Sequence, residues 1–167
     1  NAVFNVGIAE PWNALGTGIY RDDFMGPLYG GPSGITVPAQ VVQHGLDPTR
    51  IRIVEPFSQA NVPYIIGGVP NDMTFTTPGY VEFIVDPAAG TAYIPSSWLG
   101  FKLDVGTGNG PEDFYLASVY ADETTPVYGK YEVDTGMISF HQPRSIMWHI
   151  PDGRGNYTNL SGLFAVA

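Results

Sequence analysis

The chain has 167 residues and a formal net charge of −9, because it contains 16 Asp and Glu residues but only 7 Lys and Arg residues. This charge excludes the basic surface with which proteins neutralise nucleic-acid phosphates, and it disfavours contact with anionic membranes. With no cysteine, disulfides, thiolate metal sites and cysteine nucleophiles are excluded as well. The length fits a single domain over residues 1–167 that folds without covalent cross-links.

Glycine and proline divide the chain into short segments. The 21 Gly and 15 Pro residues are spread along the whole length, and no window of a dozen residues keeps a helical apolar period free of them. We therefore expect almost no helix. The strands predicted in chain order are 18–24, 39–43, 50–55, 80–85, 91–94, 113–120, 131–133, 137–140, 145–150 and 163–166, with long loops at 25–38 and 100–112. This spacing predicts an antiparallel β-sandwich of about ten strands.

Two hairpins carry the clearest local signals. In residues 80–94 the turn between the strands begins with Asp86 and ends with Gly90. In residues 131–140 the turn begins with Asp134 and ends with Gly136. Asp starts such turns and Gly adopts the left-handed conformation that closes them, so both segments are predicted to be antiparallel pairs.

Four segments, in order, resemble a family of domains in surface lipoproteins of Bacteroidetes. Residues 12–24 (WNALGTGIYRDDF) are similar to its opening W-x-x-L-G-x-G-x-[YF]-x-D-D-F motif. The further matches are 47–57 (DPTRIRIVEPF), 128–140 (YGKYEVDTGMISF) and 161–167 (SGLFAVA). Two departures are that 55–57 reads Glu-Pro-Phe instead of Asn-Pro-Tyr, and that the closing Leu-Pro-Gly is missing. The resemblance implies an exported, lipid-anchored, all-β domain, and it implies no particular activity.

No catalytic constellation is predicted. The chain has three histidines, His44, His141 and His149, but no G-x-S-x-G motif that would supply a serine nucleophile. The Asp-Thr-Gly sequence of residues 134–136 resembles an aspartic-protease motif, but it fits a hairpin turn better. A glycoside hydrolase needs two carboxylates that face each other across a cleft, and the sequence does not indicate such a pair. We expect the candidate carboxylates to accept hydrogen bonds from backbone groups or from arginine instead. The carboxylates are Asp22, Asp23, Glu112 and Asp113, and the arginines are Arg21, Arg50 and Arg52.

No metal or cofactor is predicted either. The histidines lack the spacing of a zinc site, and the acidic loop 104–113 does not fit an EF-hand pattern. Calcium in that loop is the alternative to a solvated acidic loop, which we favour.

Aromatic residues supply the binding hypothesis. Trp148 alternates with Ile146 and Ile150 and is expected in the core, and Trp12 is expected to pack against the strand that follows it. Trp98 and Tyr29 lie in segments rich in Gly, Pro and Ser, so we expect them on exposed loops. Exposed aromatic rings stack on neutral sugars, which makes Trp98 and Tyr29 the predicted ligand-binding residues.

The sequence thus predicts a non-catalytic exported or cell-surface domain that binds a neutral polysaccharide or a surface protein. Low lysine content, with only Lys102 and Lys130, and the family resemblance favour an extracellular location, with any lipid anchor upstream. No apolar run is long enough to cross a membrane. Two alternatives remain open: a structural or assembly module such as a stalk, coat or fimbrial subunit, and an accessory domain of a larger secreted enzyme.

Overall fold

A computed structural model describes residues 10–70, 72–76, 78–120, 124–141, 145–151, 155–158 and 163–165. The two helices are α1 (Met25–Leu28) and α2 (Val62–Ile66). The strands in the first half of the chain are β1 (Trp12–Asp22), β2 (Ile35–His44), β3 (Arg50–Val54), β4 (Thr74–Phe75), β5 (Tyr80–Asp86) and β6 (Thr91–Tyr93). Those in the second half are β7 (Ser97–Leu103), β8 (Glu112–Ala117), β9 (Gly129–Glu132), β10 (Met137–Ser139), β11 (Ile146–His149), β12 (Gly155–Thr158) and β13 (Leu163–Ala165).

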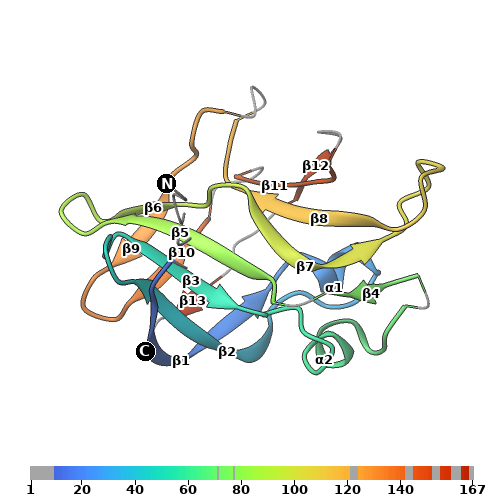
Figure 1. Ribbon diagram of the computed structural model, residues 1–167, viewed down its shortest axis with the longest axis horizontal. Helices are drawn as coiled ribbons and strands as arrows, with labels where there is room; N and C mark the ends of the chain where they lie inside the picture. The colour runs from blue at the N-terminus through green and yellow to red at the C-terminus, as the bar shows by residue number, and fades with distance from the viewer. Residues whose placement is uncertain are drawn as a thin grey trace, which may run out of the picture.

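These strands form two antiparallel sheets that pack on each other (Figure 1). The larger sheet has the order β1-β13-β10-β9-β6-β5-β3-β2, and it closes on itself because β2 also pairs with β1. The smaller sheet has the order β12-β11-β8-β7-β4. The predicted all-β, antiparallel, sandwich-like fold is confirmed. The closure of the larger sheet was not predicted, and it arises because β13 pairs with both β1 and β10.

Both predicted hairpins are present. Strand β5 pairs with β6 and strand β9 pairs with β10. The turns close as their sequences indicate, since Gly90 and Gly136 have φ angles of 67° and 68°. In the first turn the Asp86 carboxylate accepts hydrogen bonds from the backbone N–H groups of Ala88 and Ala89. The turn residues therefore agree with the observed pairing of both hairpins.

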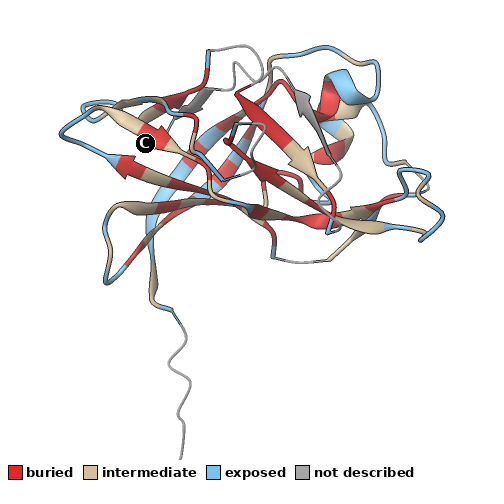
Figure 2. Ribbon diagram, turned by 90° about the horizontal axis from the view of Figure 1, so that it is seen from above, coloured by how far each residue is buried: buried red, intermediate tan, exposed pale blue. Residues whose placement is uncertain are grey.

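One apolar core lies between the sheets and inside the larger one. Buried residues follow the strands, whereas exposed residues gather at the hairpin turns (Figure 2). The Phe57 ring is central, because it makes edge contacts with Tyr20, Phe24 and Phe101 at centroid distances of 5.1, 6.0 and 5.8 Å. The core thus joins β1, the segment after β3 and the smaller sheet.

Two predicted loops are partly wrong. Residues 100–112 were expected to be a loop, but residues 97–103 form β7, in which Lys102 pairs with Asp113. Gly100 serves there as a close-packing residue rather than as a loop residue. A Cβ added to Gly79 would lie 2.2 Å from the backbone of Leu99, so the two glycines let two backbones touch.

The loop predicted at 25–38 is shorter than expected. It contains α1, and β2 begins at Ile35 rather than at Ala39. The helical turn starts where the Asp22 carboxylate accepts hydrogen bonds from the backbone N–H groups of Met25 and Gly26, at 3.0 and 2.8 Å. A side chain thus supplies the acceptors that the first turn of a helix otherwise lacks.

Candidate functional site

The most promising site is a hollow on the outside of the larger sheet, which we call the tyrosine groove. It forms where β6 pairs with β9, at Thr91 with Lys130 and at Ala92 with Gly129. Ala92 is buried, so its neighbour Tyr93 points to the opposite face of the strand. Tyr128 immediately precedes β9 and is 56% exposed. The strand alternation therefore brings two tyrosines to one surface.

The two tyrosine rings stand edge to face. Their centroids are 5.7 Å apart and the ring planes make an angle of 80°. They line a hollow of about 590 Å³, whose walls are also formed by Ile84, Pro87 and Ala89. Its polar lining residues include Thr49, Asp86 and Thr91. The groove therefore combines aromatic and aliphatic surface with a few oxygen atoms able to hold hydroxyl groups.

A smaller hollow of about 350 Å³ continues the groove, because Thr91 and Tyr128 line both. Lys130, Ser139 and His141 contribute to this second part. The Lys130 ammonium group is paired with the carboxylate of Glu132. The positive charge is thus already matched by a carboxylate, and this end of the groove is polar rather than strongly cationic.

Trp98, the first predicted ligand-binding residue, lies on a strand and not on a loop as expected. It belongs to β7, and its Cα partner is Tyr115 of β8. The indole Nε1–H donates a hydrogen bond to the Asp113 carboxylate at 3.2 Å, and the side chain is half-buried. The loop prediction failed because the Pro-Ser-Ser sequence at 95–97 was taken as loop, whereas Ser97 is buried and donates to the carbonyl of Pro95.

Tyr29, the second predicted residue, lies at the end of α1 and is 38% exposed. Partial burial, reinforced by the nearby carboxylate of Asp72, raises the pKa of Tyr29 to about 12. Neither Tyr29 nor Trp98 lines the tyrosine groove. The structure therefore places the predicted residues outside the site that its surface suggests.

The carboxylates near the opening motif have structural partners, as predicted. Asp22 is fully buried and accepts a further hydrogen bond from the Tyr20 hydroxyl at 3.1 Å. Burial raises the pKa of Asp22, although its hydrogen bonds oppose that shift. Asp23 is also buried and lies 3.3 Å from Nε of Arg21. Both side chains therefore act within the fold rather than in an acidic active site.

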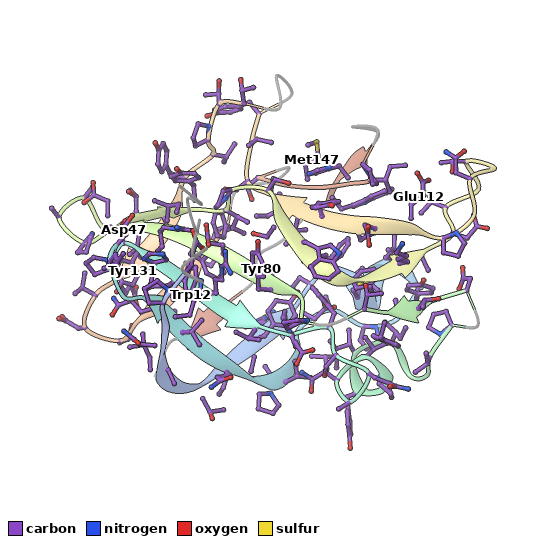
Figure 3. The ribbon with its side chains drawn as sticks, viewed as in Figure 1. Trp12, Asp47, Tyr80, Glu112, Tyr131 and Met147 are labelled. Carbon is purple, nitrogen blue, oxygen red and sulfur yellow. The ribbon has the colours of Figure 1, made fainter. Side chains whose placement is uncertain are left out.

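Trp12 belongs to a cluster whose stacking surface is occupied. The guanidinium carbon of Arg52 lies 3.9 Å from the Trp12 ring centroid and 3.7 Å from that of Tyr80. Trp12 and Tyr80 are labelled in Figure 3. Arg50 and Arg52 donate to the Glu82 carboxylate at 3.2 and 2.7 Å. Trp12 was expected to pack against the strand that follows it, but it is part of β1 and contacts Arg50 and Arg52 of β3 instead. These cation–π contacts leave no open ring face between Trp12 and Tyr80.

One serine and one histidine are hydrogen-bonded to each other. The Ser96 hydroxyl lies 2.9 Å from Nε2 of His149, and Nδ1 of that ring lies 3.2 Å from the carbonyl oxygen of Ile150. The His149 ring also stacks on Tyr115 at a centroid distance of 5.1 Å. The pair lines neither part of the groove, so it carries no catalytic assignment.

The acidic loop is organised by its own hydrogen bonds. Asp104 accepts from the backbone N–H of Gly106 at 2.8 Å, and Glu112 accepts from the Thr107 hydroxyl at 2.6 Å. Within the described ranges no three His, Cys, Asp or Glu side chains are grouped as metal ligands would be. The same part of the chain contains no helix long and apolar enough to cross a membrane.

Comparison with known proteins adds no assignment, since no family model, curated protein or solved structure matches the chain. The lipoprotein-domain resemblance therefore stays a prediction. Sequence reasoning missed Tyr93 and Tyr128. The alternation of Ala92, Tyr93 and Ile94 in the predicted hairpin was the available signal, because it sends Tyr93 outward.

Proposed function

We propose that this chain is a non-catalytic binding domain of an exported or surface protein, and that it holds a neutral polysaccharide in the tyrosine groove. One observation carries the proposal. Tyr93 and Tyr128, ring against ring, line a hollow that also offers aliphatic walls and isolated oxygen atoms. That combination is typical of sites for small or chain-like neutral ligands.

The chemistry of a sugar fits this lining. A neutral sugar offers no charge, so its affinity comes from stacking a C–H face on an aromatic ring and from hydrogen bonds to its hydroxyl groups. Tyr128 supplies the exposed ring, and the edge contact with Tyr93 limits its movement. Thr49, Thr91 and Asp86 supply oxygen atoms. The net charge of −9 disfavours polyanionic glycans by repulsion.

The extracellular location and an upstream lipid anchor belong to the same proposal, and they are supported by the low lysine content and the family resemblance. An accessory domain of a secreted enzyme would use the groove in the same way, to keep the enzyme on its polymer. A stalk, coat or fimbrial subunit is the remaining alternative, and it would not need the groove to bind sugar.

Affinity gel electrophoresis tests the proposal. The full chain is run through gels containing soluble neutral polysaccharides, with glucans, xylan and galactomannan as probes and polygalacturonate as the anionic control. We expect retardation by at least one neutral polymer and none by polygalacturonate. Tyr128→Ala should weaken the apparent affinity about tenfold or more, which corresponds to roughly 1.4 kcal/mol. Tyr93→Ala should weaken it less, because that ring is less exposed.

Tyr64→Ala is the matched control, since Tyr64 lies on α2, does not line the groove and is 77% exposed. It should migrate like the wild type. The same gels test Trp98→Ala and Tyr29→Ala, which remain predicted contacts on other surfaces. If every neutral polymer leaves the wild type unretarded, or if Tyr64→Ala loses as much as Tyr128→Ala, the groove does not bind sugar in the way proposed.

A further inference from the structure

The tyrosine groove crosses neighbouring strands of the larger sheet instead of following one of them. The strands that line its two parts lie in the order β10-β9-β6-β5 (Figure 1). Neighbouring strands lie about 4.8 Å apart, so a lining that crosses four of them is roughly 14 Å long. That length exceeds the width of one sugar ring, and a ligand that fills the groove must therefore extend across the strands.

One row of polar side chains crosses these four strands. Lys130 of β9 is the Cα partner of both Ser139 of β10 and Thr91 of β6. Thr91 is in turn the Cα partner of Asp86 of β5. Cα partners on neighbouring strands direct their side chains to the same face of a sheet, so the four side chains lie in a row. All four line the groove, and the row thus offers it a hydrogen-bonding group on each strand.

A second row, two residues further along the strands, is apolar and aromatic. Tyr93 of β6 is the Cα partner of Ile84 of β5. On the other side of β6, Ala92 pairs with Gly129, which brings Tyr128 opposite Tyr93, in agreement with the ring contact at 5.7 Å. The groove therefore has an apolar row beside a polar one. An extended chain of sugars is divided in the same way, with C–H groups on its ring faces and hydroxyl groups along its edges.

The exposed ring of Tyr128 stands where the two hollows meet, because it lines both of them. On one side of it lies the hollow of about 590 Å³, which reaches Ile84 and Asp86 of β5. On the other side lies the hollow of about 350 Å³, which reaches Ser139 of β10. A sugar chain that ended on Tyr128 would leave one of these hollows empty. The geometry therefore favours a chain that continues past the ring in both directions.

We propose that the groove binds an internal stretch of an extended polysaccharide chain, which crosses the strands from β10 to β5. The sugar stacked on Tyr128 then has neighbours on both sides, and one hydroxyl-bearing edge of the chain faces Lys130, Thr91 and Asp86. This inference rests on the proposed function, and it adds the length and the direction of the bound ligand. A site for a single sugar would not use two rows of side chains that cross several strands.

Titration calorimetry of the full chain with cello-, laminari-, xylo- and manno-oligosaccharides of two to six sugars tests the proposal. In at least one series the dissociation constant should fall about tenfold or more from the disaccharide to the tetrasaccharide, and should change less than about twofold from the pentasaccharide to the hexasaccharide. A hexasaccharide modified at both ends, by borohydride reduction at one and O-methylation at the other, should bind like the unmodified one, because an internal stretch makes the contacts.

Two variants test the polar row. Thr91→Val removes a hydroxyl group from its middle with little change in shape, and Lys130→Ala removes a donor beyond Tyr128. Each should reduce the gain in affinity between disaccharide and hexasaccharide by about threefold or more. Lys102→Ala is the matched control, because the other lysine of the chain lies on β7 and lines neither hollow. It should keep the gain of the wild type, and circular dichroism checks the fold of each variant.

The outcomes separate this inference from the proposed function. If no neutral polymer retards the chain and no oligosaccharide binds, both are overturned. If a polymer retards the chain and Tyr128→Ala weakens that binding, the groove binds sugar. In that case the internal stretch alone is overturned when the disaccharide binds as tightly as the hexasaccharide, or when modification of both ends abolishes binding. An equal loss in Lys102→Ala and Lys130→Ala would overturn the role of the polar row.

Discussion

The guanidinium group of Arg52 lies over the indole ring of Trp12, with its central carbon 3.9 Å from the ring centroid. Trp12 is the first residue of β1 and Arg52 lies in the middle of β3, on the far side of β2. The contact therefore spans three adjacent strands. On its other side the same guanidinium group contacts Tyr80, the first residue of β5. One cation thus ties together the outer face of four neighbouring strands.

Replacing Arg52 should therefore destabilise the fold even though it lies outside the apolar core. Arg52→Ala removes two cation–π contacts and the 2.7 Å hydrogen bond to the buried carboxylate of Glu82. We expect the free energy of unfolding to fall by about 2–3 kcal/mol. Arg52→Lys should still lower it by about 1 kcal/mol, because an ammonium group lacks the planar surface that stacks between two rings. Urea denaturation measures both values, and equal stability of Arg52→Lys and wild type would contradict this role.

Asp22 should be among the most sensitive polar positions. Its carboxylate accepts hydrogen bonds from two backbone N–H groups and from the Tyr20 hydroxyl, all of them buried. Asp22→Ala leaves three buried donors without this partner, so we expect a loss of roughly 2–4 kcal/mol. Asp22→Asn keeps one acceptor oxygen and should lose less. Thermal or urea unfolding at neutral pH ranks the two variants, and the reverse order would contradict the hydrogen-bond account.

The same residue predicts a pH dependence with a definite sign. Burial raises the pKa of Asp22 above its ordinary value of 3.8, so the folded state holds the proton more tightly than the unfolded state. The stability that this titration contributes is complete below pH 3.8 and is lost as the pH rises through the raised pKa. Relative to Asp22→Asn, the wild type should therefore lose stability as the pH rises from below 3.8 to neutral. Urea unfolding of both proteins across this range measures the difference, and a rising difference would show the opposite shift.

The contact between Gly79 and the β7 backbone predicts a contrast between two glycines. In Gly79→Ala the new methyl group would lie 2.2 Å from the Leu99 backbone, which cannot move without shifting β7. We expect a loss of at least about 3 kcal/mol. In Gly90→Ala the new group would meet only the Tyr131 carbonyl oxygen at 3.4 Å, and the cost is the positive φ alone, about 1 kcal/mol. Similar losses in denaturant unfolding would contradict the close approach at Gly79.

The sequence predictions were accurate where the interacting residues are close in sequence, and less accurate where they are far apart. The turns at Asp86–Gly90 and Asp134–Gly136 are encoded within a few residues, so both hairpins were predicted. The closure of the larger sheet depends on β13 reaching both β1 and β10, and no local pattern encodes that pairing. Gly100 was placed in a loop because its partner, Gly79, is distant in sequence.

The site was missed for the same reason. Trp98 was favoured because its neighbours are those of a loop, yet Asp113 on the next strand holds its indole nitrogen. Tyr93 and Tyr128 are 35 positions apart and meet only because β6 pairs with β9. Alternation showed that Tyr93 points outward, but it did not show which ring would lie beside it.

Aromatic rings connect the two sheets through the core. Phe57 contacts Phe101 of β7, Phe101 stacks on Phe114 of β8 at 5.3 Å, and Phe114 stacks on Trp148 of β11 at 5.0 Å. We therefore expect a local opening of the larger sheet to disturb the packing of rings in the smaller one. The chain should unfold cooperatively, in one step. Trp148, although it belongs to the smaller sheet, should act as a built-in fluorescent reporter of the melting of the larger one.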